Sequence, residues 1–158
     1  MIVENESFED ITQLSDKLFI CNWNTSRNIN FIEKIKTNYI VCISEHEKDE
    51  ETLNSYRELN IKHIHIKLYD NGSEKIRKLF SYAKLISEIL KNETVLVHCM
   101  SGISRSPMFI MLIWYFDNEK INIELYDKLL NFFKLKRKIS INEGFSKQLE
   151  EIYKKSKL

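Results

Sequence analysis

The segment VLVHCMSGISRSP, residues 95–107, decides how this sequence folds. Residues 94–97 form a short apolar run rich in β-branched side chains, which predicts a strand buried on both faces. Residues 108–116 are apolar on nearly all sides, as in a helix inside a core. Pro107 is tolerated in the first turn of such a helix. The sequence therefore predicts a buried strand, a tight loop and a buried helix in direct succession.

The loop between this strand and this helix is a candidate anion site. Five residues with Gly102 in the middle separate Cys99 from Arg105. A loop that ends at a helix N-terminus points several backbone N–H groups at one place, and the helix dipole adds partial positive charge there. Such an environment favours a thiolate over a thiol. Cys99 is the expected nucleophile, and Arg105 is expected to bind an anion through two parallel hydrogen bonds.

A buried, unreactive cysteine and a surface arginine would explain a lone pair at this spacing, but here the neighbouring residues fit a motif. Residues 98–106, HCMSGISRS, resemble the signature loop of the dual-specificity branch of the protein tyrosine phosphatase superfamily, H-C-x-x-G-x-S-R-S, without a departure. The resemblance implies an α/β fold with a central, mostly parallel twisted sheet of about five strands flanked by helices. The active site would lie in the strand–loop–helix segment 95–116.

The resemblance also implies a role for each residue of the loop. Ser106 matches the hydroxyl that stabilises the thiolate when it leaves the phosphocysteine, although a helix-capping serine is the simpler interpretation and both roles can coexist. His98 matches the histidine that orders the loop. No metal and no cofactor are expected, because arginine and backbone N–H groups supply the charge stabilisation. The groups expected to bind the phosphate belong to Met100, Ser101, Gly102, Ile103, Ser104 and Arg105.

Asp70 is the expected general acid and base. Residues 61–68 alternate with period two and predict a strand, and the apolar spacing after Ser73 predicts a long helix that ends near Asn92. A strand–helix–strand unit is a parallel crossover, so Asp70 and Cys99 would follow the carboxyl ends of their strands at one edge of the sheet. The departing ester oxygen needs a proton there.

Asp70 also suits a plain turn, because Asn-Gly follows it directly. Asp49 and Glu74 are the nearest rival acids, but neither directly follows the strand. In the family that the motif resembles, the general acid is an aspartate placed as Asp70 is, after a strand and before a long helix.

Histidines and further cysteines raise two other chemistries. His63 and His65 share one strand face, but no third ligand stands at a suitable spacing, so a partly exposed edge face is expected rather than a metal site. Cys42 lies on a strand expected to neighbour that of Cys99 and could protect it as a disulfide, as in some relatives. Cys42 and Cys21 are more simply core residues.

The rest of the chain reads as short elements around this unit. Residues 141–149, INEGFSKQL, resemble the closing P-N-x-G-F-x-x-Q-L helix start of the family, with Ile141 in place of proline. The basic run 134–138 is expected to be a solvated helix end. The remaining predictions are strands at 11–14, 17–20 and 39–43, helices at 28–36, 53–59 and 123–138, a polar loop at 22–26, an exposed acidic loop at 44–51 and a frayed tail at 154–158.

Composition limits the remaining choices. A chain of 158 residues with 43% apolar and 30% charged residues predicts one globular catalytic domain over 1–158. A net charge of +1 gives no reason to expect nucleic-acid binding, and no apolar run approaches the length that crosses a bilayer. The acidic N-terminus lacks the pattern of a signal peptide. Three cysteines predict reduced thiols inside the cell, in cytoplasm or nucleus. The oligomeric state stays open, with a monomer expected.

The expected activity is hydrolysis of phosphotyrosine and of phosphoserine or phosphothreonine in proteins, through a phosphocysteine. The residues at 100, 101, 103 and 104 carry no charge, whereas relatives that cleave inositol phospholipids have lysines there. A compact chain without pocket-deepening loops implies a shallow cleft that admits all three phosphoresidues. The alternatives are a phosphatase of RNA 5′ ends or phosphoinositides, and a phosphate-binding adaptor with vestigial catalysis.

Overall fold

The computed structural model describes residues 9–155, which build a five-stranded sheet of order β1-β2-β5-β3-β4. Strands β2, β5, β3 and β4 pair in parallel, and β1 pairs antiparallel with β2 at one edge. The expected mostly parallel sheet of five strands is therefore confirmed. The strands are β1 (Ile11–Ser15), β2 (Leu18–Cys21), β3 (Tyr39–Ile43), β4 (Lys62–Ile66) and β5 (Val95–His98).

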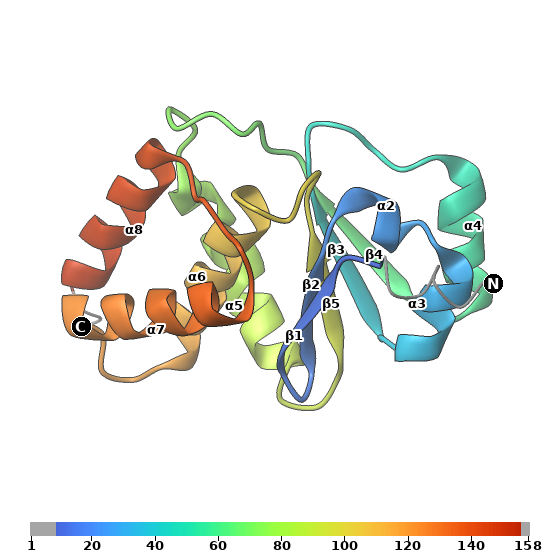
Figure 1. Ribbon diagram of the computed structural model, residues 1–158, viewed down its shortest axis with the longest axis horizontal. Coiled ribbons are helices and arrows are strands. Elements are labelled where there is room, and N and C mark those ends of the chain that lie inside the picture. The colour runs from blue at the N-terminus through green and yellow to red at the C-terminus, as the bar shows by residue number, and fades with distance from the viewer. Residues whose placement is uncertain (1–8, 156–158) are drawn as a thin grey trace.

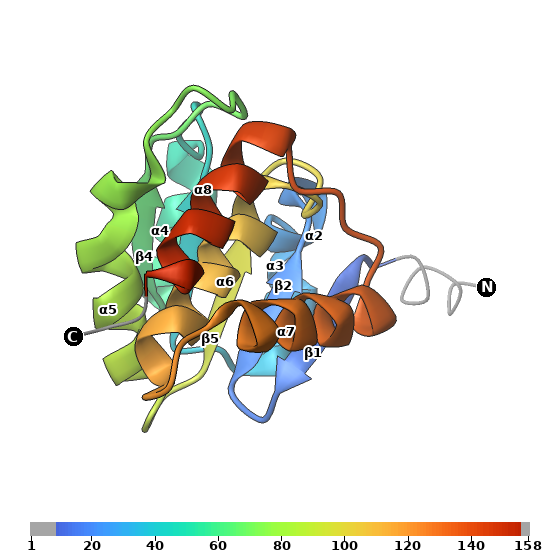
Figure 2. The ribbon, with the colours of Figure 1, turned by 90° about the vertical axis from the view of Figure 1, so that its left-hand side faces the viewer.

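Helices cover both faces of this sheet (Figure 1). One face carries α2 (Trp23–Ser26), α3 (Ile29–Ile35) and α4 (Glu50–Glu58). The other face carries the 3₁₀ helix η1 (Ile76–Leu79), α5 (Phe80–Ile89), α6 (Arg105–Asp117), α7 (Ile123–Lys136) and α8 (Glu143–Lys154). Figure 2 shows this thicker layer in front of the sheet, with α8 in front of α6 and α5 to the left of both.

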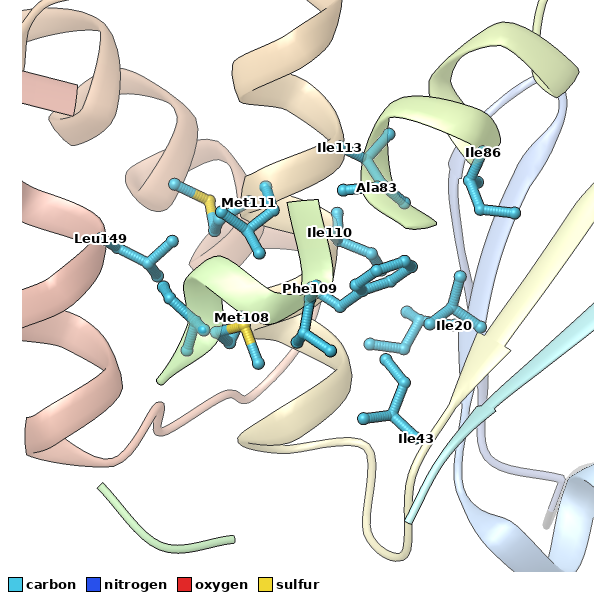
Figure 3. Close-up of a cluster of buried hydrophobic side chains, with 14 of the residues drawn as sticks. Ile20, Ile43, Ala83, Ile86, Met108, Phe109, Ile110, Met111, Ile113 and Leu149 are labelled. Atoms are coloured by element: carbon cyan, nitrogen blue, oxygen red, sulfur yellow. The ribbon is translucent and has the colours of Figure 1, made fainter. Parts of the chain in front are cut away.

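Helix α6 is the centre of the larger core. Its side chains are buried from its first residue to Ile113, as the apolar sequence predicts. Figure 3 shows Phe109 and Ile110 of α6 beside Ile20 and Ile43 of the sheet, with Ala83 and Ile86 of α5 above them and Leu149 of α8 to the left. Each such side chain contributes about 1.5–3 kcal/mol when it leaves water. The helix that begins at the anion loop is thus fixed by the core itself.

Three local predictions are wrong. Residues 22–26 are not a loop, because the Asn22 side chain accepts a hydrogen bond from Thr25 N (2.9 Å) and caps the short helix α2. Ser73 does not cap a helix, since its hydroxyl donates to Asn71 Oδ1 (2.9 Å) within a turn. The predicted long helix is therefore split, with η1 starting at Ile76 and α5 following it.

The acidic N-terminal stretch and the last three residues of the expected frayed tail fall outside residues 9–155. Across the described part, no helix combines the length and the apolar character needed to cross a membrane.

Candidate active site

The loops after β3, β4 and β5 leave the sheet at the same end, where these parallel strands have their carboxyl ends, at the top of Figure 1. They carry Glu45, Asp70 and Cys99, respectively. This placement follows from the parallel pairing, because the carboxyl ends of parallel strands all lie at the same end of the sheet. The prediction that one edge would hold both Asp70 and Cys99 agrees with this topology.

Cys99 lies at the bottom of the loop with its thiol almost closed to solvent (2% exposed). Its Sγ accepts a hydrogen bond from Gly102 N (3.3 Å) and lies 3.2 Å from Ser106 Oγ. Two hydrogen-bonding groups thus lie beside the sulfur of Cys99. The structure therefore brings Ser106 to the sulfur, and Ser104 rather than Ser106 stands at the helix N-cap.

Gly102 has φ +73°, a backbone conformation that glycine adopts without strain. This turn directs the Gly102 N–H inward at the sulfur. The N–H groups of Ser101, Ile103 and Ser104 form no hydrogen bond with any other described part of the chain. The loop thus offers unused donors beside the thiol, as an anion site requires.

Arg137 holds this loop from behind. Its Nε donates to Gly102 O (2.9 Å) and its Nη2 to Ser101 O (3.3 Å), while the guanidinium forms an ion pair with Asp10 (2.8 Å). The prediction of a solvated basic helix end is therefore wrong for Arg137. Helix α7 ends at Lys136, so the next residue turns inward and is buried instead of continuing the exposed basic face.

Arg105 is buried at the start of α6 (6% exposed). Its Nη1 donates to Glu45 Oε1 (2.5 Å) and to Leu68 O (3.0 Å). The hydrogen bond from Arg105 lowers the pKa of Glu45 to about 2, so Glu45 is a carboxylate at neutral pH. Within residues 9–155, Nε and Nη2 of Arg105 have no hydrogen-bond partner. These two atoms form one edge of the guanidinium that can bind two oxygens of one phosphate.

Asp70 is exposed, and its Oδ1 accepts two hydrogen bonds, from Ser104 Oγ (2.9 Å) and from Asn142 Nδ2 (2.7 Å). Ser104 Oγ also accepts from Asn142 N (3.0 Å), so the three residues form a closed network. The carboxyl group of Asp70 is thereby tied to the same loop that holds Cys99. Ser104, expected to bind phosphate, also positions this acid.

The two rival acids are engaged elsewhere. Asp49 accepts hydrogen bonds from Thr52 Oγ1 (2.9 Å) and Thr52 N (3.0 Å), which cap α4 and keep the pKa of Asp49 below its usual range. Glu74 accepts a hydrogen bond from Tyr69 N (3.0 Å) and pairs with Lys78 (2.6 Å). Both carboxylates therefore have partners away from residues 99–105, whereas the carboxyl group of Asp70 contacts Ser104 of that loop.

Helix α8 fixes the segment that carries Asp70. The Gln148 side chain donates to Glu74 O (2.8 Å) and Gly72 O (3.3 Å) and accepts from Ile76 N (2.9 Å). A Cβ placed on Gly144 would come within 2.4 Å of Gly72, so the two glycines allow the close approach of the two backbones. The closing motif at 141–149 therefore acts by holding the acid loop.

His98 lies behind the loop, fully buried. Its Nδ1 is 3.0 Å from Cys99 O, and Lys48 Nζ donates to its Nε2. Burial and the charge of Lys48 hold the pKa of His98 well below its usual range, so the ring is neutral. The expected exposed loop at 44–51 is wrong at Lys48, which is only 5% exposed because its side chain turns into the protein.

A second group of titratable side chains surrounds this contact. The donor atoms of Cys42, His63 and His98 all lie within 4.8 Å of one another, a group that sequence spacing did not reveal because its members come from three strands. His63 Nε2 is buried and has no hydrogen-bond partner among the described residues. Sulfur and imidazole nitrogen are donors that Zn²⁺ prefers. However, Lys48 already occupies the Nε2 lone pair of His98.

The two other cysteines are free, buried thiols. Cys42 pairs in register with His98, so β3 neighbours the strand of Cys99 as expected. Burial raises the pKa of Cys42 to about 11 and that of Cys21 further. Both therefore stay protonated at neutral pH, as suits the core residues that the sequence favours over a protective disulfide.

Sequence reasoning missed Glu45, Lys48 and Arg137 as parts of the site. All three are charged residues in polar segments, and nothing in their local pattern separates them from solvated neighbours. The signal that would have found Glu45 is its place directly after a predicted strand of the parallel sheet. Lys48 and Arg137 carry no such signal.

Comparison with known families and proteins gives a consistent result. The family model "Dual specificity phosphatase, catalytic domain" matches residues 18–155. YVH1, a dual specificity protein phosphatase of Plasmodium falciparum, is 32% identical over 149 residues, covering 89% of this chain and 24% of that protein. A probable dual specificity protein phosphatase of Dictyostelium discoideum is 36% identical over 91 residues, covering 57% and 22%. The chain spans about a quarter of the length of these two curated relatives.

Solved structures share the fold. Human DUSP28 superposes with a TM-score of 0.74 at 14% identity, over 90% of this chain and 92% of that one. The Yvh1 phosphatase domain of Chaetomium thermophilum gives a TM-score of 0.68 at 23% identity, over 90% and 93%. A human tyrosine phosphatase-like serine/threonine/tyrosine-interacting protein gives 0.69 at 21% identity, over 90% and 95%.

Proposed function

Because this chain belongs to the dual specificity phosphatase family, we propose that it is a protein phosphatase that works through a phosphocysteine. The observation that carries the proposal is the convergence on one loop of three groups. A buried thiol with two donors, the open edge of a guanidinium and a tethered carboxyl group meet at residues 99–105. These are a nucleophile, an anion holder and a proton donor.

In the first step the Cys99 thiolate attacks the phosphorus atom and the bond to the ester oxygen breaks. The departing oxygen takes a proton from Asp70, whose position is set by Ser104 and Asn142. The three phosphoryl oxygens are bound by the unused N–H groups of the loop and by Nε and Nη2 of Arg105. Glu45 and Leu68 O fix the other end of the guanidinium, so its open edge faces the phosphate.

In the second step a water molecule attacks the phosphorus atom of the phosphocysteine. Asp70, now a carboxylate, takes a proton from this water, and the sulfur–phosphorus bond breaks. Ser106 Oγ, 3.2 Å from Sγ, donates a hydrogen bond to the thiolate that leaves. The products are the free thiolate and inorganic phosphate, so the enzyme returns to its starting state.

Phosphoproteins are the proposed substrates. Two large apolar side chains flank the loop and are exposed: Met100 (43%) directly after Cys99, and Tyr69 (51%) directly before Asp70. Apolar side chains at the rim suit the flanks of a peptide, whereas an inositol phosphate would call for cations there. Phosphotyrosine, phosphoserine and phosphothreonine all belong to the proposal.

The first test is hydrolysis of p-nitrophenyl phosphate in metal-free buffer at mildly acidic pH. Wild type should turn over and Cys99→Ser should be inert. An inert wild type would remove the enzyme proposal and favour a phosphate-binding adaptor.

The substrate class needs a panel. Phosphopeptides should be hydrolysed with higher kcat/KM than phosphoinositides or RNA with a 5′-triphosphate end. A preference for either of the latter two would overturn the phosphoprotein assignment while leaving the phosphatase chemistry in place.

A further inference from the structure

Lys48 is the least expected feature near the site. It follows β3 in a segment rich in acidic residues, yet its side chain is buried and its Nζ donates to His98 Nε2. A charged lysine is almost never buried without a partner of opposite charge. In the described part of the chain, Lys48 forms no ion pair with a carboxylate. Groups other than a carboxylate must therefore stabilise its ammonium.

Two aromatic rings lie beside the ammonium of Lys48. Nζ lies 4.9 Å from the centre of the Trp23 ring and 5.7 Å from that of Tyr56, which are cation–π distances. Each such contact offsets part of the free energy that the ammonium loses when it leaves water. Burial lowers the pKa of Lys48 to about 8, which still leaves the ammonium form dominant at pH 7. The fold thus keeps a positive charge behind the catalytic loop.

The hydrogen bond of Lys48 determines where His98 carries its proton. An ammonium only donates, so Nε2 of the neutral ring must accept. The ring proton then sits on Nδ1, which is 3.0 Å from Cys99 O and donates to it. The chain of contacts runs from Lys48 through His98 to the backbone of the nucleophile. Without the ammonium, the ring could carry its proton on either nitrogen.

We propose that Lys48 is a positioning residue that fixes the Nδ1–H tautomer of His98 and thereby holds the carbonyl group of Cys99 in place for catalysis. The inference rests on the proposed function for its catalytic part only. The ammonium of Lys48 binds Nε2 of His98, so this nitrogen is not free to join Cys42 and His63 in binding a metal ion. The positive charge beside Cys42, His63 and His98 is thus the ammonium of Lys48.

The direct test is NMR on ¹⁵N-labelled wild-type protein. Long-range ¹⁵N–¹H correlations report which ring nitrogen of His98 carries the proton, and His98→Gln assigns the signals. The expected result is a proton on Nδ1. A proton on Nε2 in wild type overturns the proposal, whether or not any variant folds and whether or not the protein is a phosphatase.

The second arm uses variants. Lys48→Met keeps the length of the buried stem and removes donor and charge, while Lys48→Arg keeps both, and Lys62→Met removes an exposed lysine as the matched control. Because Lys48→Met removes a charge-assisted hydrogen bond to His98, it should lower kcat for p-nitrophenyl phosphate about tenfold or more. KM should change less, and Lys48→Arg should retain most of the activity.

Three results contradict the proposal in this arm. A folded Lys48→Met with wild-type kcat and the Nδ1–H tautomer would show that Lys48 does not position His98. Loss of kcat with an unchanged tautomer would leave only a packing role. A cobalt titration in which wild type binds one equivalent of Co²⁺ with a thiolate charge-transfer band would show that the place belongs to a metal ion. An inert wild type with Nδ1–H on His98 would instead defeat the function alone.

Discussion

Asp70 is the residue whose proposed role depends most on its neighbours. It is exposed, and among the described residues its carboxyl group accepts hydrogen bonds from Ser104 and Asn142. A carboxyl group held in this way can donate its proton to an ester oxygen without first searching for the right position. The chemistry therefore depends on side chains from three separate segments.

Asp70→Asn should slow hydrolysis of phenyl phosphate about 10²–10³-fold, because the leaving oxygen loses its proton donor. Esters with very good leaving groups need no proton and should be affected much less. A series of aryl phosphates with increasing leaving-group pKa measures this, with Glu74→Gln as the control. An equal loss across the whole series would remove Asp70 from the acid role.

Glu45 is predicted to hold Arg105 through a charge. Glu45→Gln replaces the ion pair with a neutral hydrogen bond, which is worth about 1–2 kcal/mol less. We expect kcat/KM for p-nitrophenyl phosphate to fall about tenfold. Glu47→Gln, in the same loop but with an exposed side chain, should have no such effect. If both variants behave alike, Glu45 does not orient the arginine.

At the scale of elements, the strand–loop–helix unit was predictable because its information is local. The apolar run before Cys99, the glycine at φ +73° and the apolar helix after Pro107 each follow from the residues of that stretch. The remote contacts were not predictable, because Arg137 and Lys48 come from segments whose composition indicates solvent. Their inward direction is decided by tertiary packing, which single-sequence patterns do not contain.

Arg137 joins the end of α7 to the catalytic loop, and its replacement should lower the free energy of unfolding. Arg137→Met leaves the carbonyl groups of Gly102 and Ser101 without their donor and leaves Asp10 unpaired. We expect unfolding free energy to fall by about 2–4 kcal/mol, measured by urea denaturation. Lys138→Met, one residue further and exposed, should change it by less than about 0.5 kcal/mol. Equal effects would mean that Arg137 is a solvated residue after all.

At the scale of the whole molecule, buried neutral histidines make the fold sensitive to acid. Burial lowers the pKa of His63 to about 3, whereas the unfolded chain protonates this ring near its ordinary value. The folded pKa is depressed, so the stability contribution is complete above about pH 6.5 and is lost as the pH falls toward 3. His98 acts in the same direction, and Glu45 adds to the loss below about pH 4.5.

His63→Phe should therefore flatten this acid limb. Phenylalanine can keep the stacking on Tyr56, whose ring centre lies 5.6 Å away, and it has no proton to gain. Between neutral pH and about pH 5, the unfolding free energy of the variant should fall by about 1–2 kcal/mol less than that of wild type. Urea unfolding at the two pH values measures the difference. A wild type as stable at about pH 5 as at neutral pH would contradict the account.

The parallel sheet places the loops after β3, β4 and β5 at one end of the molecule, and the core fixes α6 behind them (Figure 1, Figure 3). The topology and the main catalytic candidates followed from the sequence, because one motif and the parallel crossover rule place them. The extent of the domain, the location in the cell and the oligomeric state stay predictions.

The central claim is that Cys99 forms a covalent bond to the phosphoryl group. It is tested most directly by rapid quenching during turnover of p-nitrophenyl phosphate, followed by mass spectrometry of the peptide that contains residue 99. The account predicts a peptide heavier by one phosphoryl group in wild type and none in Cys99→Ser. Turnover by Cys99→Ser, or a phosphoryl group on another residue of the wild type, would contradict it.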